Sequence, residues 1–87
     1  MTAETRILGI LIKHRSTNID LVQDIFSKFG CSIRTRLGIN ISHEYKVNDC
    51  GMIILELTGD IREMDKLENA LKDLHQVQVN KMVFEED

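Results

Sequence analysis

A thiol and an imidazole flank one polar segment of the chain and could bind a metal ion. His43 lies within residues 42–49, Ser-His-Glu-Tyr-Lys-Val-Asn-Asp, and Cys50 follows directly after them. Imidazole and thiolate are good ligands for soft divalent ions, and the carboxylates of Glu44 and Asp49 are nearby oxygen donors. Two good ligands are too few for a tight site unless an oligomer supplies a second pair. We therefore expect no stoichiometric metal ion at His43 and Cys50 in the purified protein.

Two arginines lie two residues apart in the run Gly-Cys-Ser-Ile-Arg-Thr-Arg-Leu-Gly-Ile-Asn, residues 30–40. On one face of a strand, the guanidinium groups of Arg34 and Arg36 could bind a carboxylate or a phosphate group. Edge strands, however, commonly carry charged side chains that deter further strand pairing. We favour this second interpretation, in which both arginines pair with acidic groups of the helices or of a partner subunit. Gly38, inside the same strand, predicts a bulge or a close approach of another backbone or a ligand.

Catalysis has little support in the sequence. His14, His43 and His75 fall at the ends of expected elements, and no nucleophile motif such as G-x-S-x-G accompanies them. No glycine-rich phosphate loop is present, and the two cysteines are too few for an iron–sulfur cluster. We expect neither an enzyme nor a bound cofactor.

The length of the chain predicts one small domain, residues 1–87, and we expect it to be cytoplasmic because its start lacks a basic region followed by a long apolar run. A net charge of −3 provides no overall field to attract nucleic acid or anionic lipid. The longest apolar run, residues 7–12, is far shorter than the roughly 20 residues that span a bilayer. The chain contains no proline and no low-complexity segment that would mark a linker. We therefore expect no direct contact with nucleic acid or a membrane.

Hydrophobic periodicity predicts six elements in the order βαββαβ. Residues 6–13 and 50–58 are apolar at both odd and even positions, as in strands buried on both faces. Residues 31–41 and 76–84 alternate with a period of two, which is typical of half-buried strands and places both arginines on the wetter face. Between the strands, apolar residues recur at helical spacing from Ile19 to Phe29 and from Met64 to Leu74. Ser16 or Thr17 is the expected N-cap of the first helix, and Asp60 that of the second.

This order predicts an α+β, ferredoxin-like fold, a four-stranded antiparallel sheet with two helices on one face. The strands over residues 6–13 and 50–58 should be central, because only they are apolar on both faces. The other sheet face would then be uncovered, and contiguous apolar patches of that kind mark interaction surfaces. We expect a homo-oligomer, a dimer or larger, that uses this face. It would present Ile7 or Leu8, Met52, Ile54, and Met82 or Phe84.

Three segments resemble one family across nearly the whole chain. They are Ile-Arg-Thr-Arg-Leu-Gly at 33–38, Met-Ile-Ile-Leu-Glu-Leu-Thr-Gly-Asp at 52–60 and Met-Asp-Lys-Leu-Glu-Asn-Ala-Leu at 64–71. They are similar to the iron-only hydrogenase system regulators, short proteins of the ACT-like superfamily. The resemblance implies an ACT-like oligomer with a regulatory role, linked to the iron-only hydrogenase system.

Residues 48–60 also resemble the metal-sensing domain of the nickel-responsive transcription regulators. In that family the cysteine corresponding to Cys50 is a metal ligand, and two ligand histidines would align near Ser42 and Glu44. Those regulators contact DNA through an N-terminal ribbon-helix-helix segment, whereas here the first strand begins almost at residue 1. We therefore expect no DNA-binding segment in this chain.

Our leading hypothesis is a small regulatory or ligand-sensing oligomer, involved in transcription or another process. Its ligand is a small molecule of unknown identity. The alternative is a structural or adaptor subunit that docks a partner protein through the open sheet face. Candidate ligand-binding or interface residues are Arg34, Arg36, Gly38, Met52 and Ile54.

Overall fold

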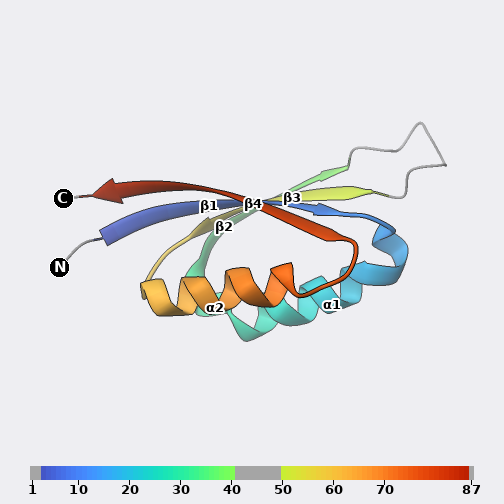
Figure 1. Ribbon diagram of the computed structural model, residues 1–87, viewed down its shortest axis with the longest axis horizontal. Coiled ribbons are helices and arrows are strands. Elements are labelled where there is room, and N and C mark those ends of the chain that lie inside the picture. Colours follow the sequence, from blue (N-terminus) through green and yellow to red (C-terminus); the bar gives the residue numbers. More distant parts are fainter. Residues whose placement is uncertain (1–2, 41–49, 87) are drawn as a thin grey trace.

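The computed structural model describes residues 3–40 and 50–86, which fold into two layers (Figure 1). One layer is an open antiparallel sheet, and the other consists of two helices that lie against a single face of that sheet. The elements in chain order are β1 (Ala3–Ile12), α1 (Arg15–Lys28), η1 (Gly30–Ser32), β2 (Ile33–Asn40), β3 (Gly51–Leu57), α2 (Ile61–Lys72) and β4 (Val77–Glu86).

The strand order is β2-β3-β1-β4, so the two strands predicted to be central are central. β1 pairs with β3 on one side and with β4 on the other, antiparallel in both cases. This arrangement confirms the α+β, ferredoxin-like prediction with its βαββαβ order. The last strand continues to Glu86, beyond the predicted end at residue 84, because it pairs with β1 along the full length of both strands.

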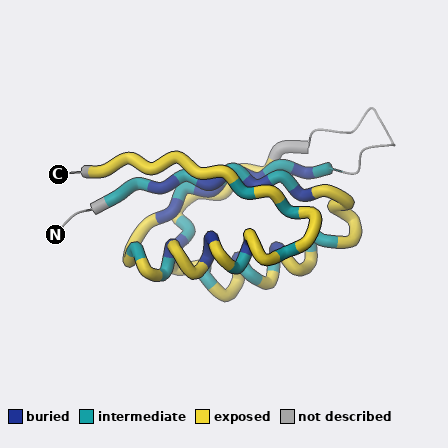
Figure 2. Tube along the Cα trace, viewed as in Figure 1, coloured by how far each residue is buried: buried dark blue, intermediate teal, exposed yellow. Residues whose placement is uncertain are grey.

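The core lies between the sheet and the helices (Figure 2). Along β3, buried residues alternate strictly with half-buried ones, because successive side chains point to opposite faces of the sheet and only one face is covered by the helices. α2 contributes its predicted apolar positions, and α1 contributes a shorter set. The core side chains are Leu8, Ile10, Ile12, Val22, Phe26, Ile53, Leu55, Leu57, Met64, Leu67 and Leu71.

The two helices begin differently. Asp60 is the N-cap of α2, as predicted, and its Oδ1 accepts a hydrogen bond from the backbone N–H of Arg62 at 2.8 Å. The expected N-cap of α1 at Ser16 or Thr17 is wrong, because α1 already begins at Arg15. His14 occupies the cap position in a left-handed conformation (φ 51°) and its side chain caps nothing. Instead, the side-chain amide of Asn18 donates to the carbonyl oxygens of Lys13 and His14, at 2.8 and 3.3 Å.

β2 departs most from its predicted alternation. The strand begins at Ile33, after the short 3₁₀ turn η1, and its register against β3 shifts between Ile33 and Thr35. Such a bulge inserts one extra residue, here Arg34, and changes which side chains share a face. Beyond the bulge, Arg36 pairs with the fully buried Leu55 and therefore lies on the helix-covered face. The prediction that both arginines share the wetter face of the strand is thus wrong for Arg36.

Within residues 3–40 and 50–86, no helix combines the length and the apolar character that crossing a membrane requires.

Candidate functional site

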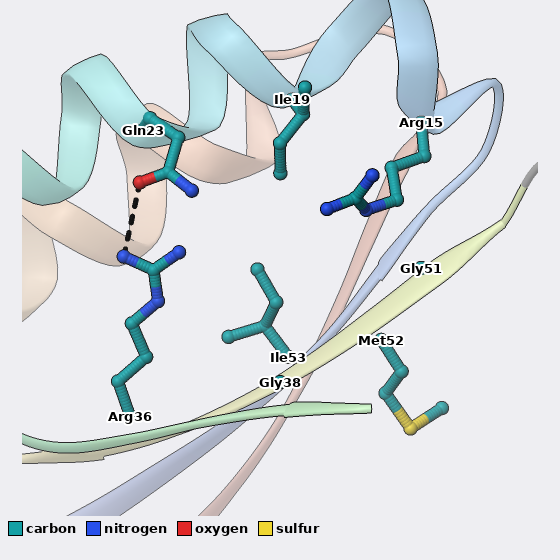
Figure 3. Close-up of a pocket in the computed structure, with 8 residues that line it drawn as sticks. All are labelled: Arg15, Ile19, Gln23, Arg36, Gly38, Gly51, Met52 and Ile53. Atoms are coloured by element: carbon teal, nitrogen blue, oxygen red, sulfur yellow. Dashed lines mark hydrogen bonds between the residues drawn. The ribbon is translucent and has the colours of Figure 1, made fainter. Parts of the chain in front are cut away.

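A cavity of about 260 Å³ opens between the first half of α1 and the neighbouring parts of β2 and β3 (Figure 3). Side chains from the helix form one wall, and the strands form the other. The cavity lies on the helix-covered side of the sheet, at the end where β2 finishes and β3 begins. Its lining residues are Arg15, Ile19, Gln23, Arg36, Gly38, Gly51, Met52 and Ile53.

The guanidinium group of Arg36 is held in place at one end of the cavity. Its Nη1 donates a hydrogen bond to the side-chain oxygen of Gln23 at 3.0 Å, and its central carbon lies 4.9 Å from the centre of the Phe26 ring. Stacking on an aromatic face and one hydrogen bond restrict the side chain while leaving further N–H donors for a ligand. The bulge of β2 makes this possible, because it turns Arg36 toward α1.

Arg15 approaches the cavity from the start of α1, where its guanidinium group points inward (Figure 3). Its side chain crosses directly above Gly51, since a Cβ atom at Gly51 would lie only 2.6 Å from the Cδ atom of Arg15. A side chain at Gly51 would force Arg15 into another position. Sequence reasoning missed Arg15, because a single arginine at a helix start is ordinary; the glycine that makes room for it is distant in sequence.

The cavity is cationic. Among the described residues, its lining contains two guanidinium groups and no carboxylate. In the part of the chain that the structure describes, neither Arg15 nor Arg36 forms an ion pair, whereas other basic residues there do. Arginine donors recognise carboxylate and phosphate groups with two parallel hydrogen bonds. The arrangement is therefore chemically suited to a small anion.

The other predicted strand residues have different positions. Arg34 is the extra residue at the bulge, where it is exposed and does not line the cavity. Gly38 is not at a bulge, so that part of the prediction is wrong. Gly38 lines the cavity instead, and no atom lies within 4 Å of the place where its Cβ would be. Among the described residues, no other backbone approaches Gly38 closely. Because Gly38 has no side chain, it leaves the cavity open.

The opposite sheet face is apolar, as predicted, and none of the described elements covers it. Ile7 rather than Leu8 belongs to this face, because Leu8 is fully buried beneath the helices. Met82 and Phe84 both lie on it, since they pair with Ile7 and Thr5. Leu37, Met82 and Phe84 are each 55% exposed. The apolar residues of this open face are Ile7, Leu11, Leu37, Met52, Ile54, Met82 and Phe84.

The predicted metal candidates are only partly covered by the structure. His43 lies outside the described residues, and Cys50 is half-buried directly before β3. The two cysteines, Cys31 and Cys50, do not form a disulfide. Among residues 3–40 and 50–86, no three His, Cys, Asp or Glu side chains come together as a metal site would require. The absence of a stoichiometric metal ion stays a prediction that elemental analysis would test.

A second charged cluster lies where β1 meets α2, and the sequence analysis missed it. Arg6 is only 4% exposed, and its Nη1 donates to Asp65 at 2.8 Å and to Glu68 at 3.0 Å. Its Nε donates to Glu4 at 2.7 Å. Burial alone would lower the pKa of Arg6, but the hydrogen bonds to Glu4 and Asp65 raise it, so Arg6 stays charged. This cation is fully compensated inside the domain.

Glu68 links the same cluster to two lysines. Its Oε2 accepts from Lys72 at 2.7 Å and lies 3.3 Å from the Nζ of Lys81 on β4. Burial would raise the pKa of Glu68, yet the hydrogen bonds from Lys72 and Lys81 outweigh it and hold the pKa below its usual range. The cluster thus connects β1, α2 and β4.

No protein-family model matches the sequence, and no curated protein matches it. Solved structures do share its fold. The uncharacterized protein TM1266 from Thermotoga maritima superposes with a TM-score of 0.81 at 20% identity, over 97% of this chain and 99% of that one. The ACT domain from the GTP pyrophosphokinase of Chlorobium tepidum gives 0.58 at 19% identity, over 94% and 85%.

A further similar structure is CPII, a nitrogen regulatory PII-like protein from Thiomonas intermedia K12, solved with ADP, AMP and bicarbonate bound. Its TM-score is 0.66 at 12% identity, over 100% of this chain and 99% of CPII. At such identities the likeness establishes the fold alone. The structural neighbours of this chain are therefore ACT-like and PII-like domains.

Proposed function

We propose that this protein is a ligand-sensing regulatory domain that acts as a homo-oligomer and has no catalytic activity of its own. The observation that carries the proposal is the cavity between α1, β2 and β3, where Arg15 and Arg36 have no acidic partner among the described residues. Support also comes from the fold, because it is shared with an ACT domain and with CPII, which binds small molecules. Among the described lining residues, none is a nucleophile paired with a base.

The regulated process is proposed on sequence resemblance alone. Residues 33–38, 52–60 and 64–71 are similar to the iron-only hydrogenase system regulators, and we extend the proposal to that system. A role in transcription would need a DNA-binding partner.

The proposed oligomer forms through the open sheet face. Apolar side chains from all four strands lie on that face, and a second copy of the same patch is the simplest way to exclude water from it. Leu37 gives a clean test because it is 55% exposed, so a charge there does not disturb the core. Leu21 on α1 is a matched control, since it is 50% exposed on the helix layer.

Sedimentation at micromolar concentration should give a dimer or larger species for the wild-type protein and for Leu21→Glu, and a smaller species for Leu37→Glu. If Leu37→Glu sediments like the wild type, the open face is not the interface. If the wild type is a monomer, the alternative of an adaptor that docks another protein on this face gains support.

A thermal-shift screen of metabolites tests the sensing function. A ligand that binds only the folded protein should stabilise it by about 2.7 kcal/mol at a hundred times its dissociation constant. An adaptor should respond to none of the small molecules. The absence of any stabilising compound across amino acids, nucleotides and organic acids would contradict the proposed function.

A further inference from the structure

We infer that the cavity binds a small organic dianion, a molecule with one acidic oxyanion group at each end of a short apolar spacer, of the dicarboxylate class. The inference rests on the proposed sensing function, because it identifies the ligand of the same cavity. Charge, the spacing of the two arginines, the apolar surface between them and the cavity volume each constrain the ligand.

The charge requirement is for two negative groups. Arg15 and Arg36 bring two permanent positive charges to one cavity, and none of its described lining residues is a carboxylate. Two guanidinium groups that face a shared cavity repel each other, and an anion between them removes that repulsion. A ligand with a single charge would leave one of the two uncompensated.

The two charges are anchored far apart along the sheet. Arg36 stands opposite Leu55 on β3, whereas Arg15 crosses above Gly51. Four residues of a strand span about 13 Å between these two anchor points. Because Arg36 is held by Gln23 and the Phe26 ring, it is not free to swing toward Arg15. Figure 3 shows the two guanidinium groups on opposite sides of the cavity. This spacing favours two separate acidic groups over one compact phosphate.

The surface between the two charges is apolar. Ile19 from α1 and Ile53 from β3 point toward one another across the middle of the cavity (Figure 3). A methylene spacer would pack between them and be removed from water, which favours binding. The ligand is also short, because a cavity of about 260 Å³ is below the roughly 300–1,000 Å³ that drug-sized molecules occupy.

Isothermal titration calorimetry with the full chain tests the inference. The probes are a homologous series of unbranched dicarboxylates, the monocarboxylates of equal length, and inorganic phosphate. We expect one optimal dicarboxylate, bound about tenfold or more tightly than its monocarboxylate, because a hydrogen bond to a charged group contributes about 1.5–3 kcal/mol. Phosphate should bind more weakly than the optimal dicarboxylate.

Three variants locate the binding. Arg15→Gln and Arg36→Gln should each weaken the optimal dicarboxylate about tenfold or more. Arg34→Gln is the matched control: it removes the same charge from the same strand outside the cavity, so its affinity should stay near that of the wild type. Circular dichroism of each variant would verify that it is folded before titration.

The inference is overturned if no dicarboxylate binds, if monocarboxylates or phosphate bind equally well, or if Arg34→Gln loses as much affinity as the two cavity variants. It is equally overturned if another class of compound stabilises the protein in the metabolite screen while dicarboxylates do not. In that last case the sensing function stands and only the ligand class is wrong.

Discussion

Arginines in two regions of this small domain have opposite electrostatic surroundings. Arg6, between β1 and α2, is buried and bonded to Glu4, Asp65 and Glu68. At the other end of β3, Arg15 and Arg36 share a cavity in which no described lining residue is acidic. Within the described residues, the same side chain is thus fully compensated in one place and has no acidic partner in the other.

The difference separates structural charge from charge that is available to a ligand. Burying an unpaired ion is costly, so Arg6 tolerates its position only because carboxylates surround it. Exposed guanidinium groups need no partner for the fold to form. We propose that their convergence on one cavity serves binding rather than stability, and variants of the two regions can test this.

The largest expected effect is the loss of stability in Glu68→Ala. This change removes the acceptor of Arg6, Lys72 and Lys81 together and leaves a buried cation with fewer partners. We expect a cost of about 3 kcal/mol in the free energy of unfolding, measured by urea denaturation. The matched change in the cavity, Arg36→Gln, should cost no more than about 1 kcal/mol, from its lost stacking on Phe26. Equal losses in the free energy of unfolding for the two variants would contradict the distinction between structural charge and charge that is available to a ligand.

The effect of pH on stability should be smaller than the effect of Glu68→Ala. It should come from the Arg6 region. The folded-state pKa of Glu68 lies below its usual 4.5, so its contribution is present above about pH 4.5 and is lost as the pH falls toward the folded-state value. The thermal stability of the wild-type protein should therefore fall in acid. In Glu68→Gln, the plot of stability against pH should have a shallower slope. Asp60 also has a lowered pKa, through its hydrogen bond from the Arg62 N–H, and retains part of the slope in that variant. An unchanged slope in Glu68→Gln would contradict this assignment.

The smallest effects on stability concern the two cavity glycines. Gly38→Ala places a methyl group in open space and should stabilise the protein by about 0.5 kcal/mol, by reducing the freedom of the unfolded chain. Gly51→Ala meets the exposed, flexible Arg15 side chain, which can move aside at little cost in stability. Displacing Arg15 in Gly51→Ala should nevertheless weaken dianion binding relative to the wild-type protein. Calorimetry on both proteins would check this, and equal affinities would contradict a contact between Arg15 and the ligand.

Much of the architecture follows from the sequence alone. The apolar runs at residues 6–13 and 50–58 predict the two central strands, and the βαββαβ order predicts the ferredoxin-like fold that the structure has. The sequence also predicts Asp60 as the N-cap of α2, and the structure confirms it. Periodicity and capping succeed because they depend on neighbouring residues, whose spacing is written directly in the chain. The open apolar face follows from the same periodicity.

The tertiary structure alone decided the positions of the charged side chains. A bulge between Ile33 and Thr35 turned Arg36 toward α1, and a two-residue period cannot indicate where a strand inserts an extra residue. Arg15 meets Gly51, and Arg6 meets Glu68, 62 residues away along the chain. The sequence determined which residues form each element and which face is apolar, because those are local properties. Only the packed domain determined which charges meet, because long polar side chains find their partners across elements that the fold brings together.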